Sequence, residues 1–503
     1  MVSAKRESSL TIDTAWLLVA RTLSFIVSLA LPLFLVRHLH QVQFGLYKQA
    51  FLIVNTAIAM VPLGFGMSAL YFLPREPERQ KQAVLNVLLF NLVVGGLVSV
   101  AFILRPSIVE SIFGGPQMVP YAPALGVLIL LWTFSSPFDV IAIAGKDMKT
   151  ASAVILLIQL TRTAFVLGAG VFLGSVRALV LAAIVQGICQ SAAFVLYLGV
   201  RYPRFWNHFD APLMRRQLSY VLPLGAAGLL YTLQVDLHNY FVSNRFGPAV
   251  FAIYAIGTVQ LPLVGMLLES AAAVLIPRIS LLQKNGQNRE IVLLMSRAIR
   301  KLAAAYFPVY ALLLVVGPEF IRFLFTDRYV NSWPVFAINL TLLPLSIVLL
   351  DPLYRAYAEQ RYFLIRVRAV LVIAVMILLW FGTAHFGLTG AIGAVVIVNL
   401  AERIVMGIRF CRVMGVSRHD ILLVKDLSKL AVAAAGAALV TAVIRANMLR
   451  ARPLLVLLVC GAAFMAIYLP GIFLLKIPSH DEKRIVVDRL LRILPFRAGR
   501  AAS

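Results

Sequence analysis

The sequence predicts an all-α, polytopic membrane protein. Three observations lead to this fold class: a mean hydropathy of +0.91, a hydrophobic share of 61% against 13% charged residues, and about fourteen long apolar segments. A membrane-spanning helix needs roughly 20 apolar residues, because each residue rises about 1.5 Å along a hydrocarbon core of about 30 Å. This composition excludes a soluble globular protein.

The apolar segments are separated by short outer loops and by longer, basic inner connections. With the N-terminus inside, about 34 of the 46 basic residues fall on cytoplasmic segments and about 10 on the outer side. Because basic loops stay in the cytoplasm, this distribution predicts that the N- and C-termini are both cytoplasmic. The expected spans are 14–36, 49–73, 83–104, 121–144, 150–173, 178–200, 219–243, 249–276, 302–325, 333–354, 365–384, 388–410, 429–446 and 454–476.

An internal repeat divides the first twelve spans into two lobes. When the segment after span 1 is aligned with the segment after span 7, Phe44 matches Phe251 and Tyr47 matches Tyr254. The offset corresponds to six spans, an even number, so both copies have the same orientation, as in parallel repeats of transporters. The predicted parts are an N-terminal lobe (1–200), a basic cytoplasmic linker (201–218), a C-terminal lobe (219–410), two additional helices (411–476) and a basic cytoplasmic tail (477–503).

The net charge of +25 is explained by these inner loops, which face an anionic leaflet. No soluble domain is expected that could bind nucleic acid. The three cysteines show neither metal-ligand spacing nor a disulfide pattern, so we expect no metal and no cofactor. The string 140–147 (VIAIAGKD) lacks the first glycine and the final Ser or Thr of a phosphate-binding loop, which argues against ATP-driven transport by this chain alone.

Two segments resemble a known family. RHLHQVQFGLYKQAFLIVN (37–55) with PLGFGMSALYFLPR (62–75) is similar to the N-terminal signature of the polysaccharide (Wzx-like) flippases, and 223–257 resembles the corresponding part of the second lobe. These flippases belong to the multidrug/oligosaccharidyl-lipid/polysaccharide (MOP) exporter superfamily. One departure is His40, which stands where the motif usually has glycine, so the first turn is expected to differ from the second, at Gly247 and Pro248.

The resemblance implies a flippase rather than an enzyme. Its substrate would be a polyprenyl-pyrophosphate-linked glycan, moved from the inner to the outer leaflet of a bacterial cytoplasmic (inner) membrane for the biosynthesis of a surface polysaccharide such as lipopolysaccharide or exopolysaccharide. A polysaccharide polymerase is a candidate partner. The internal repeat predicts two six-helix lobes with a site between them, the layout of an alternating-access transporter.

Basic residues inside the spans are candidates for binding this anionic substrate. A charge in the hydrocarbon region costs roughly 2.5–3.5 kcal/mol, so it usually faces a cavity or a partner. Arg21 begins a polar face of span 1 with Ser24 and Ser28, and Arg162 lies near the middle of span 5 with Gln159. The planar guanidinium suits phosphate oxygens. The alternative is that each arginine reaches the membrane surface or pairs with a carboxylate.

Two acidic residues in the second lobe are candidates for ion coupling. Asp236 lies in span 7 and Glu269 in the inner third of span 8. Such a carboxylate can bind H⁺ or Na⁺, or it can neutralise an arginine of the other lobe.

Two other functions stay open. A multidrug exporter of the same superfamily would bind cationic compounds through Asp236 and Glu269, although the buried arginines argue against it. An integral-membrane glycosyltransferase or polymerase would need a site in a large outer loop, and the expected outer loops are short.

Overall fold

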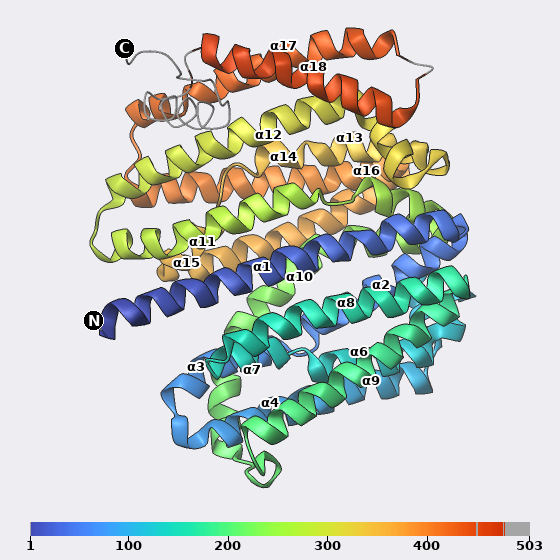
Figure 1. The fold of residues 1–503 in the computed structure, drawn as a ribbon, viewed down its shortest axis with the longest axis vertical. Coiled ribbons are helices and arrows are strands. Elements are labelled where there is room, and N and C mark those ends of the chain that lie inside the picture. Colours follow the sequence, from blue (N-terminus) through green and yellow to red (C-terminus); the bar gives the residue numbers. More distant parts are fainter. Residues whose placement is uncertain (1, 449–450, 476, 478–503) are drawn as a thin grey trace, which may run out of the picture. The chain divides into compact units, whose positions relative to one another are not determined.

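Long apolar helices make up most of the chain (Figure 1). The computed structural model describes residues 2–448, 451–475 and 477, and this part contains α-helices and short 3-10 segments but no strand. It forms two units: Met1–Met266 with Leu324–Asn339 and Ala358–Glu402, and Leu267–Phe323 with Leu340–Tyr357 and Arg403–Ser503. The predicted tail, 477–503, lies outside the described residues except for Ile477. The lobe boundaries expected from the repeat stay a prediction.

The first unit begins with helices that pack side by side: α1 along α8, α4 along α6, and α6 and α8 along α9. Two of them start at side-chain caps, where the Asp147 carboxylate accepts from the Thr150 N–H and the Ser175 hydroxyl accepts from the Ala178 N–H. The helices are α1 (Val2–His38), α2 (Gln41–Met60), α4 (Gln80–Leu104), α6 (Ala122–Ser135), α8 (Met148–Phe172) and α9 (Val176–Arg201), with the shorter α3 (Ser68–Arg75), α5 (Ser107–Phe113) and α7 (Phe138–Ala144).

Glycines in non-helical conformations break three long helical segments. After α2, Gly64 has φ 69°, and the following helix is bent by 43°. Within α10 (Ala211–Gly257), Gly247 has φ 74° and ψ 176°. Within α16 (Arg361–Met414), Gly387 has φ 57° and ψ −132°. Because positive φ is readily adopted only by glycine, each helix turns or bends at these positions.

Gly387 joins the halves of α16 as a tight hairpin. A Cβ added to Gly382 would lie 2.7 Å from the Gly390 carbonyl oxygen, and one added to Gly390 would lie 2.0 Å from that of Gly382. The two helical halves of α16 therefore pack backbone against backbone directly beside the turn. The sequence places a break here, between the spans 365–384 and 388–410.

The second unit is also helical. It contains most of α11 (Pro262–Lys284) and α12 (Asn288–Phe325), and α17 packs along α18. Its remaining helices are α14 (Leu342–Leu345), α15 (Asp351–Ala356), α17 (Asp426–Ala446) and α18 (Pro453–Leu474). The short helix α13 (Trp333–Leu340) belongs to the first unit up to Asn339. The 3-10 segments of the chain are η1 (Phe65–Met67), η2 (Pro77–Arg79), η3 (Pro116–Tyr121), η4 (Phe205–Asn207), η5 (Asp327–Ser332), η6 (Ala358–Gln360) and η7 (Arg418–Val424).

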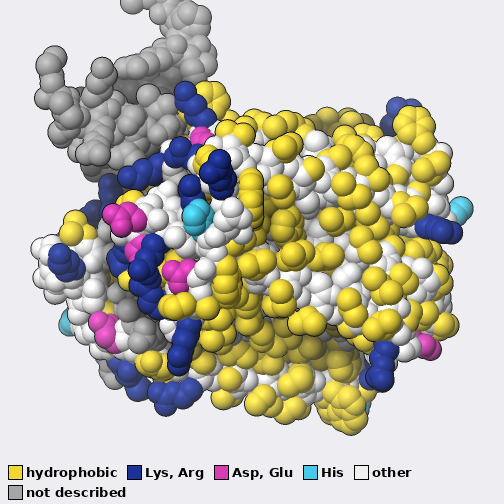
Figure 2. Space-filling view, turned by 90° about the horizontal axis from the view of Figure 1, so that it is seen from below, with side chains coloured by type: hydrophobic (Ala, Val, Ile, Leu, Met, Phe, Trp, Pro, Cys, Tyr) yellow, Lys and Arg dark blue, Asp and Glu magenta, His cyan; other side chains and the backbone are white. Residues whose placement is uncertain are grey.

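The all-helical, multi-pass fold is confirmed, but the count of fourteen spans is not. Among the described residues, ten helices are long and apolar enough to cross a membrane, or up to twelve if each of two bent pairs is one span. The expected span 333–354 consists of three short helices, α13, α14 and α15, which no longer provide the length of a single crossing. On the face shown in Figure 2, hydrophobic side chains form a wide area with Lys and Arg gathered at its margins, as a lipid-facing surface requires.

Candidate functional site

Arg162 lies deep within an apolar helix. It follows the first residue of α8, Met148, by about 21 Å along the helix axis at 1.5 Å per residue. The helix ends at Phe172, about 15 Å further on. The guanidinium is therefore placed near the middle of the span, as the sequence predicts, where reaching either membrane surface is difficult.

Side chains from two other helices hold this guanidinium. Its Cζ lies 3.9 Å from the ring centroid of Trp132 on α6 and 5.7 Å from that of Phe51 on α2. Its Nη2 donates to the Asn55 Oδ1 on α2, at 3.3 Å. Within the described part of the chain Arg162 forms no ion pair. An arginine has five N–H donors, so the ring contacts and one hydrogen bond leave donors for an anionic ligand.

The face of α2 that bears Asn55 also bears a second cation. Between Phe44 and Thr56 the helix is almost wholly buried, and the accessible positions are Lys48, Leu52 and Asn55, which share one face at i, i+4 and i+7. The Lys48 ammonium lies 5.5 Å from the ring centroid of Phe44. Lys48 and Arg162 are thus two cations beside one row of aromatic rings.

Sequence reasoning missed these neighbours of Arg162. Span 2 was expected to begin at residue 49, which left Lys48 in the preceding loop. Asn55 carries a signal, because it is the one amide in the apolar string 51–60. Trp132 carries none, since an aromatic residue in an apolar helix is ordinarily a packing residue.

The other predicted substrate-binding residues of the first lobe do not gather around Arg162. Arg21 is exposed on α1. The Ser24 hydroxyl donates to the Ile155 carbonyl of α8, at 3.2 Å, and that of Ser28 donates within its own helix to Phe25, at 2.6 Å. The amide of Gln159, one helical turn from Arg162, donates to the Thr163 hydroxyl at 3.1 Å.

Asp236 contacts α2 through a hydrogen bond. The Thr56 hydroxyl donates to its Oδ2 at 2.9 Å, and no ion pair to Asp236 occurs within the described residues. Glu269 is exposed on α11, in the second unit, and its side chain forms neither an ion pair nor a hydrogen bond with any described residue. The structure therefore does not bring the two predicted ion-coupling residues together in one unit. No group of three or more His, Cys, Asp or Glu side chains that could hold a metal ion occurs in the described ranges.

A partly buried ion pair in the same unit was not predicted. The Arg368 Nε lies 3.7 Å from the Glu402 Oε1, and the Gln234 amide of α10 donates to the Glu402 Oε2 at 2.9 Å. The guanidinium also lies 4.8 Å from the ring centroid of Tyr231. The available signal was Glu402 itself, an acid inside the expected span 388–410. Because the pair joins both halves of α16 to α10, a structural role explains it.

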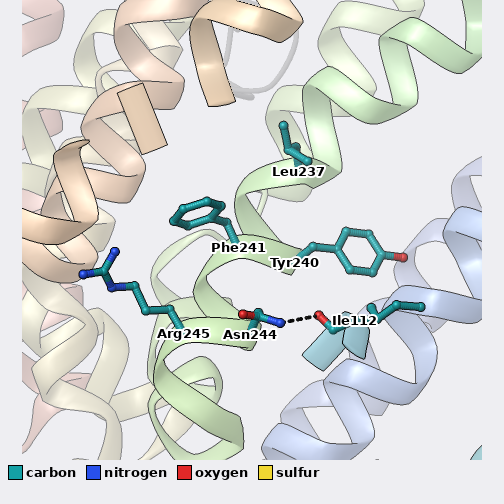
Figure 3. Close-up of a pocket in the computed structure, with 6 residues that line it drawn as sticks. All are labelled: Ile112, Leu237, Tyr240, Phe241, Asn244 and Arg245. Carbon is teal, nitrogen blue, oxygen red and sulfur yellow. Dashed lines mark hydrogen bonds between the residues drawn. The ribbon is translucent and has the colours of Figure 1, made fainter. Parts of the chain in front are cut away.

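A small cavity lies at the end of the first half of α10 (Figure 3). It has a volume of about 380 Å³ and is lined by Ile112, Leu237, Tyr240, Phe241, Asn244 and Arg245. The Asn244 amide donates to the Ile112 carbonyl at 3.1 Å, and the Arg245 guanidinium donates to the Thr383 hydroxyl at 3.3 Å. Figure 3 shows Asn244 and Arg245 pointing to opposite sides of the helix. Both polar side chains thus connect α10 to neighbouring helices.

The fold is that of the MOP-superfamily transporters. The structure is similar to that of the lipid II flippase MurJ in an inward closed conformation, with a TM-score of 0.69 and 13% identity over 96% of this chain and 100% of that one. It also resembles a MATE transporter of Vibrio cholerae, with a TM-score of 0.58 and 13% identity over 82% and 99% of the two chains. A MOP superfamily transporter from Pyrococcus furiosus gives a TM-score of 0.58 and 15% identity over 80% and 95%.

The family follows from the sequence match. The model of a family described as "Polysaccharide biosynthesis protein" matches residues 34–334, more than half of the chain, and the chain belongs to this family. The resemblance stated from residues 37–75 and 223–257 is confirmed. No curated protein matches the sequence. The proteins of similar fold are transporters and a flippase, not enzymes.

Proposed function

We propose that this protein is an alternating-access flippase. It moves a polyprenyl-pyrophosphate-linked oligosaccharide from the inner to the outer leaflet of a bacterial cytoplasmic membrane, with both termini in the cytoplasm, for surface polysaccharide biosynthesis. The family match to polysaccharide biosynthesis proteins and the fold shared with a lipid II flippase support this proposal. The observation that carries it is Arg162, a guanidinium near the middle of α8 without an ion pair among the described residues.

The chemistry of Arg162 suits a pyrophosphate. A charge-assisted hydrogen bond from a guanidinium to a phosphate oxygen is about twice as strong as a hydrogen bond between neutral groups. The fork of N–H groups can bind two oxygens at once. Lys48 adds a second positive charge on the accessible face of α2, whereas the amide of Gln159, one turn from Arg162, donates to Thr163. In this proposal the polyprenyl tail stays in the lipid while the headgroup passes through the protein.

The remaining predicted residues take secondary roles in this proposal. Arg21 lies near the N-terminal end of the expected span 14–36, which in this proposal is cytoplasmic, and would meet the anionic headgroup on entry; Ser24 and Ser28 follow it along α1. Asp236 and Glu269 are the candidates for coupling to H⁺ or Na⁺. A polysaccharide polymerase would receive the product on the outer side.

A multidrug exporter is the second candidate function. Asp236 favours it, because this half-buried carboxylate has a neutral hydrogen-bond partner, Thr56, and forms no ion pair within the described part of the chain. A carboxylate in that state could attract a cationic compound. The unpaired cation Arg162 in the same unit favours the glycan flippase.

Export of the glycan by an Arg162→Ala variant tests the proposal. With expression verified, we expect the variant to lose surface polysaccharide. Arg177→Ala is the matched control, because Arg177 is exposed in the first turn of α9 and should tolerate the same truncation. Normal surface polysaccharide in the Arg162→Ala strain would exclude the assigned role of Arg162.

A further inference from the structure

Arg162 is the first member of a chain of contacts that ends in two amides, the buried Gln186 and the partly buried Gln190. Its guanidinium stacks on the Trp132 ring at 3.9 Å. The Trp132 indole N–H donates to the Gln186 Oε1 at 3.0 Å, and the Gln186 amide donates to the Gln190 Oε1 at 2.9 Å. Trp132 is 5% exposed and Gln186 1% exposed. The contacts link α8, α6 and α9.

The two glutamines fix the orientation of the indole. A buried amide inside a membrane needs partners for its polar atoms. Because Gln190 accepts from the NH₂ group of Gln186, the carbonyl oxygen of Gln186 is left to face the indole N–H. Gly187 adds to this arrangement, since a Cβ there would lie 3.1 Å from the Trp132 Cδ1 and Nε1. The missing side chain lets the ring lie directly against α9.

We propose that Trp132 is the positioning residue of the Arg162 site, held in place by Gln186. The ring covers one face of the guanidinium and keeps its N–H fork directed at the pyrophosphate. An arginine side chain has many rotamers, and without this platform the guanidinium would sample several of them. A guanidinium already ordered by stacking on an aromatic ring loses less freedom when the anion binds. This inference rests on the proposed function.

Binding of farnesyl pyrophosphate to the purified full-length protein in lipid nanodiscs measures this effect. We expect Trp132→Leu to weaken binding by roughly tenfold, because the cation–π contact is lost. Trp132→Phe should weaken it less, since that variant keeps a ring but lacks the N–H that Gln186 fixes. Trp380→Phe is the matched control, because Trp380 is 67% exposed on α16, and its affinity should equal that of the wild type.

A fluorescence measurement gives a readout that a purely structural role would not change. In a chain whose other four tryptophans are replaced by phenylalanine, farnesyl pyrophosphate should shift the emission of Trp132, because the anion neutralises the stacked cation. The shift should disappear after Arg162→Gln. Gln186→Leu provides a second route if Trp132→Leu fails to fold, and it should weaken binding as much as Trp132→Phe does.

The outcomes separate the two proposals. Wild-type affinity in both Trp132→Leu and Gln186→Leu would overturn the positioning role and leave the proposed function standing. Thermal unfolding shows whether the wild-type protein is folded. If the folded wild-type protein does not bind farnesyl pyrophosphate, the proposed function and the positioning role are both wrong. A loss of binding in Trp132→Leu, with an unshifted emission in the chain that keeps Trp132 as its single tryptophan, would also overturn the positioning role.

Discussion

Two parallel hydrogen bonds join Glu319 of α12 to Arg445 of α17. The Arg445 Nη2 donates to the Glu319 Oε1 at 2.9 Å, and its Nε donates to the Oε2 at 3.0 Å. Glu319 is only 6% exposed. Arg322, three residues further along α12, lies 3.9 Å from the same carboxylate. Since α17 packs along α18, this ion pair connects the two C-terminal helices to the rest of the second unit.

Removing the arginine of this pair should destabilise the protein. Arg445→Leu leaves the buried carboxylate without its bidentate partner, which costs about 3–5 kcal/mol for a fully buried pair, and Arg322 should hold the loss at the lower end. We expect a lower Tm for the purified variant. The double variant Glu319→Leu/Arg445→Leu should recover most of the loss, because no unpaired charge is then buried. An Arg445→Leu variant with wild-type Tm would show that the pair contributes nothing.

Gly45 allows α2 and α10 to touch. A Cβ at Gly45 would lie 1.8 Å from the Pro248 carbonyl oxygen, so Gly45→Ala must push the helices apart. Overpacking of this kind costs about 1–3 kcal/mol, and we expect the Tm to fall. Gly96→Ala is the control, because nothing lies within 4 Å of a Cβ at Gly96 on α4 and alanine favours a helix by about 1 kcal/mol. Equal Tm values for the two variants would contradict the close contact.

This contact shows how far the repeat could be read from the sequence. The alignment of Phe44 with Phe251 and Tyr47 with Tyr254 predicts that the two turns occupy corresponding places in the repeat, and all four side chains are buried. The turns differ as expected, since His40 is extended at φ −66° and ψ 157° while Gly247 has positive φ. Nothing in the alignment indicates that the turns pack against each other, because hydropathy identifies a buried face but not the helix that covers it.

The same limit applies to the candidate site. Arg162 could be predicted because a charge in an apolar run is costly. Its partners come from α2 and α6, and only tertiary packing brings Asn55 and Trp132 to it. The polar face expected from Arg21 through Ser28 follows helical periodicity correctly, yet its hydroxyls bond to backbone carbonyls. Helical periodicity predicts which face of a helix a side chain occupies, but it does not predict which group on a neighbouring helix that side chain contacts.

The charge of Asp236 can be separated from its hydrogen bond. Asp236→Asn removes the negative charge but keeps an oxygen that accepts from Thr56, whereas Thr56→Val keeps the charge and removes the donor. If Asp236 couples transport to a cation, flipping in liposomes should lose its response to an imposed H⁺ or Na⁺ gradient in Asp236→Asn and retain it in Thr56→Val. Gradient-independent flipping by the wild-type protein would exclude Asp236 and Glu269 from coupling.

Asp420 should make stability depend on pH. Its carboxylate accepts from the Ser417 backbone N–H at 2.8 Å and from the Ser417 hydroxyl at 3.0 Å, and it also binds the Arg289 guanidinium. Chiefly the backbone hydrogen bond, with the bond from Arg289, holds the pKa of Asp420 below its ordinary value. A carboxylate with a lowered folded-state pKa stabilises the fold above its unfolded pKa of about 3.9. That contribution is lost as the pH falls through the folded-state pKa.

We therefore expect Asp420→Asn to lower the Tm at pH 7, because an amide accepts these hydrogen bonds more weakly and does not attract Arg289. The difference from the wild type should shrink below about pH 4, where the Asp420 carboxylate of the unfolded chain takes up a proton before that of the folded protein does. Tm values of both proteins between pH 7 and pH 3 measure this. Glu290→Gln is the control, since Glu290 is exposed in the first turn of α12, and it should match the wild type throughout. If the difference in Tm between Asp420→Asn and the wild type does not change with pH, the substitution acts through packing and not through the charge of Asp420.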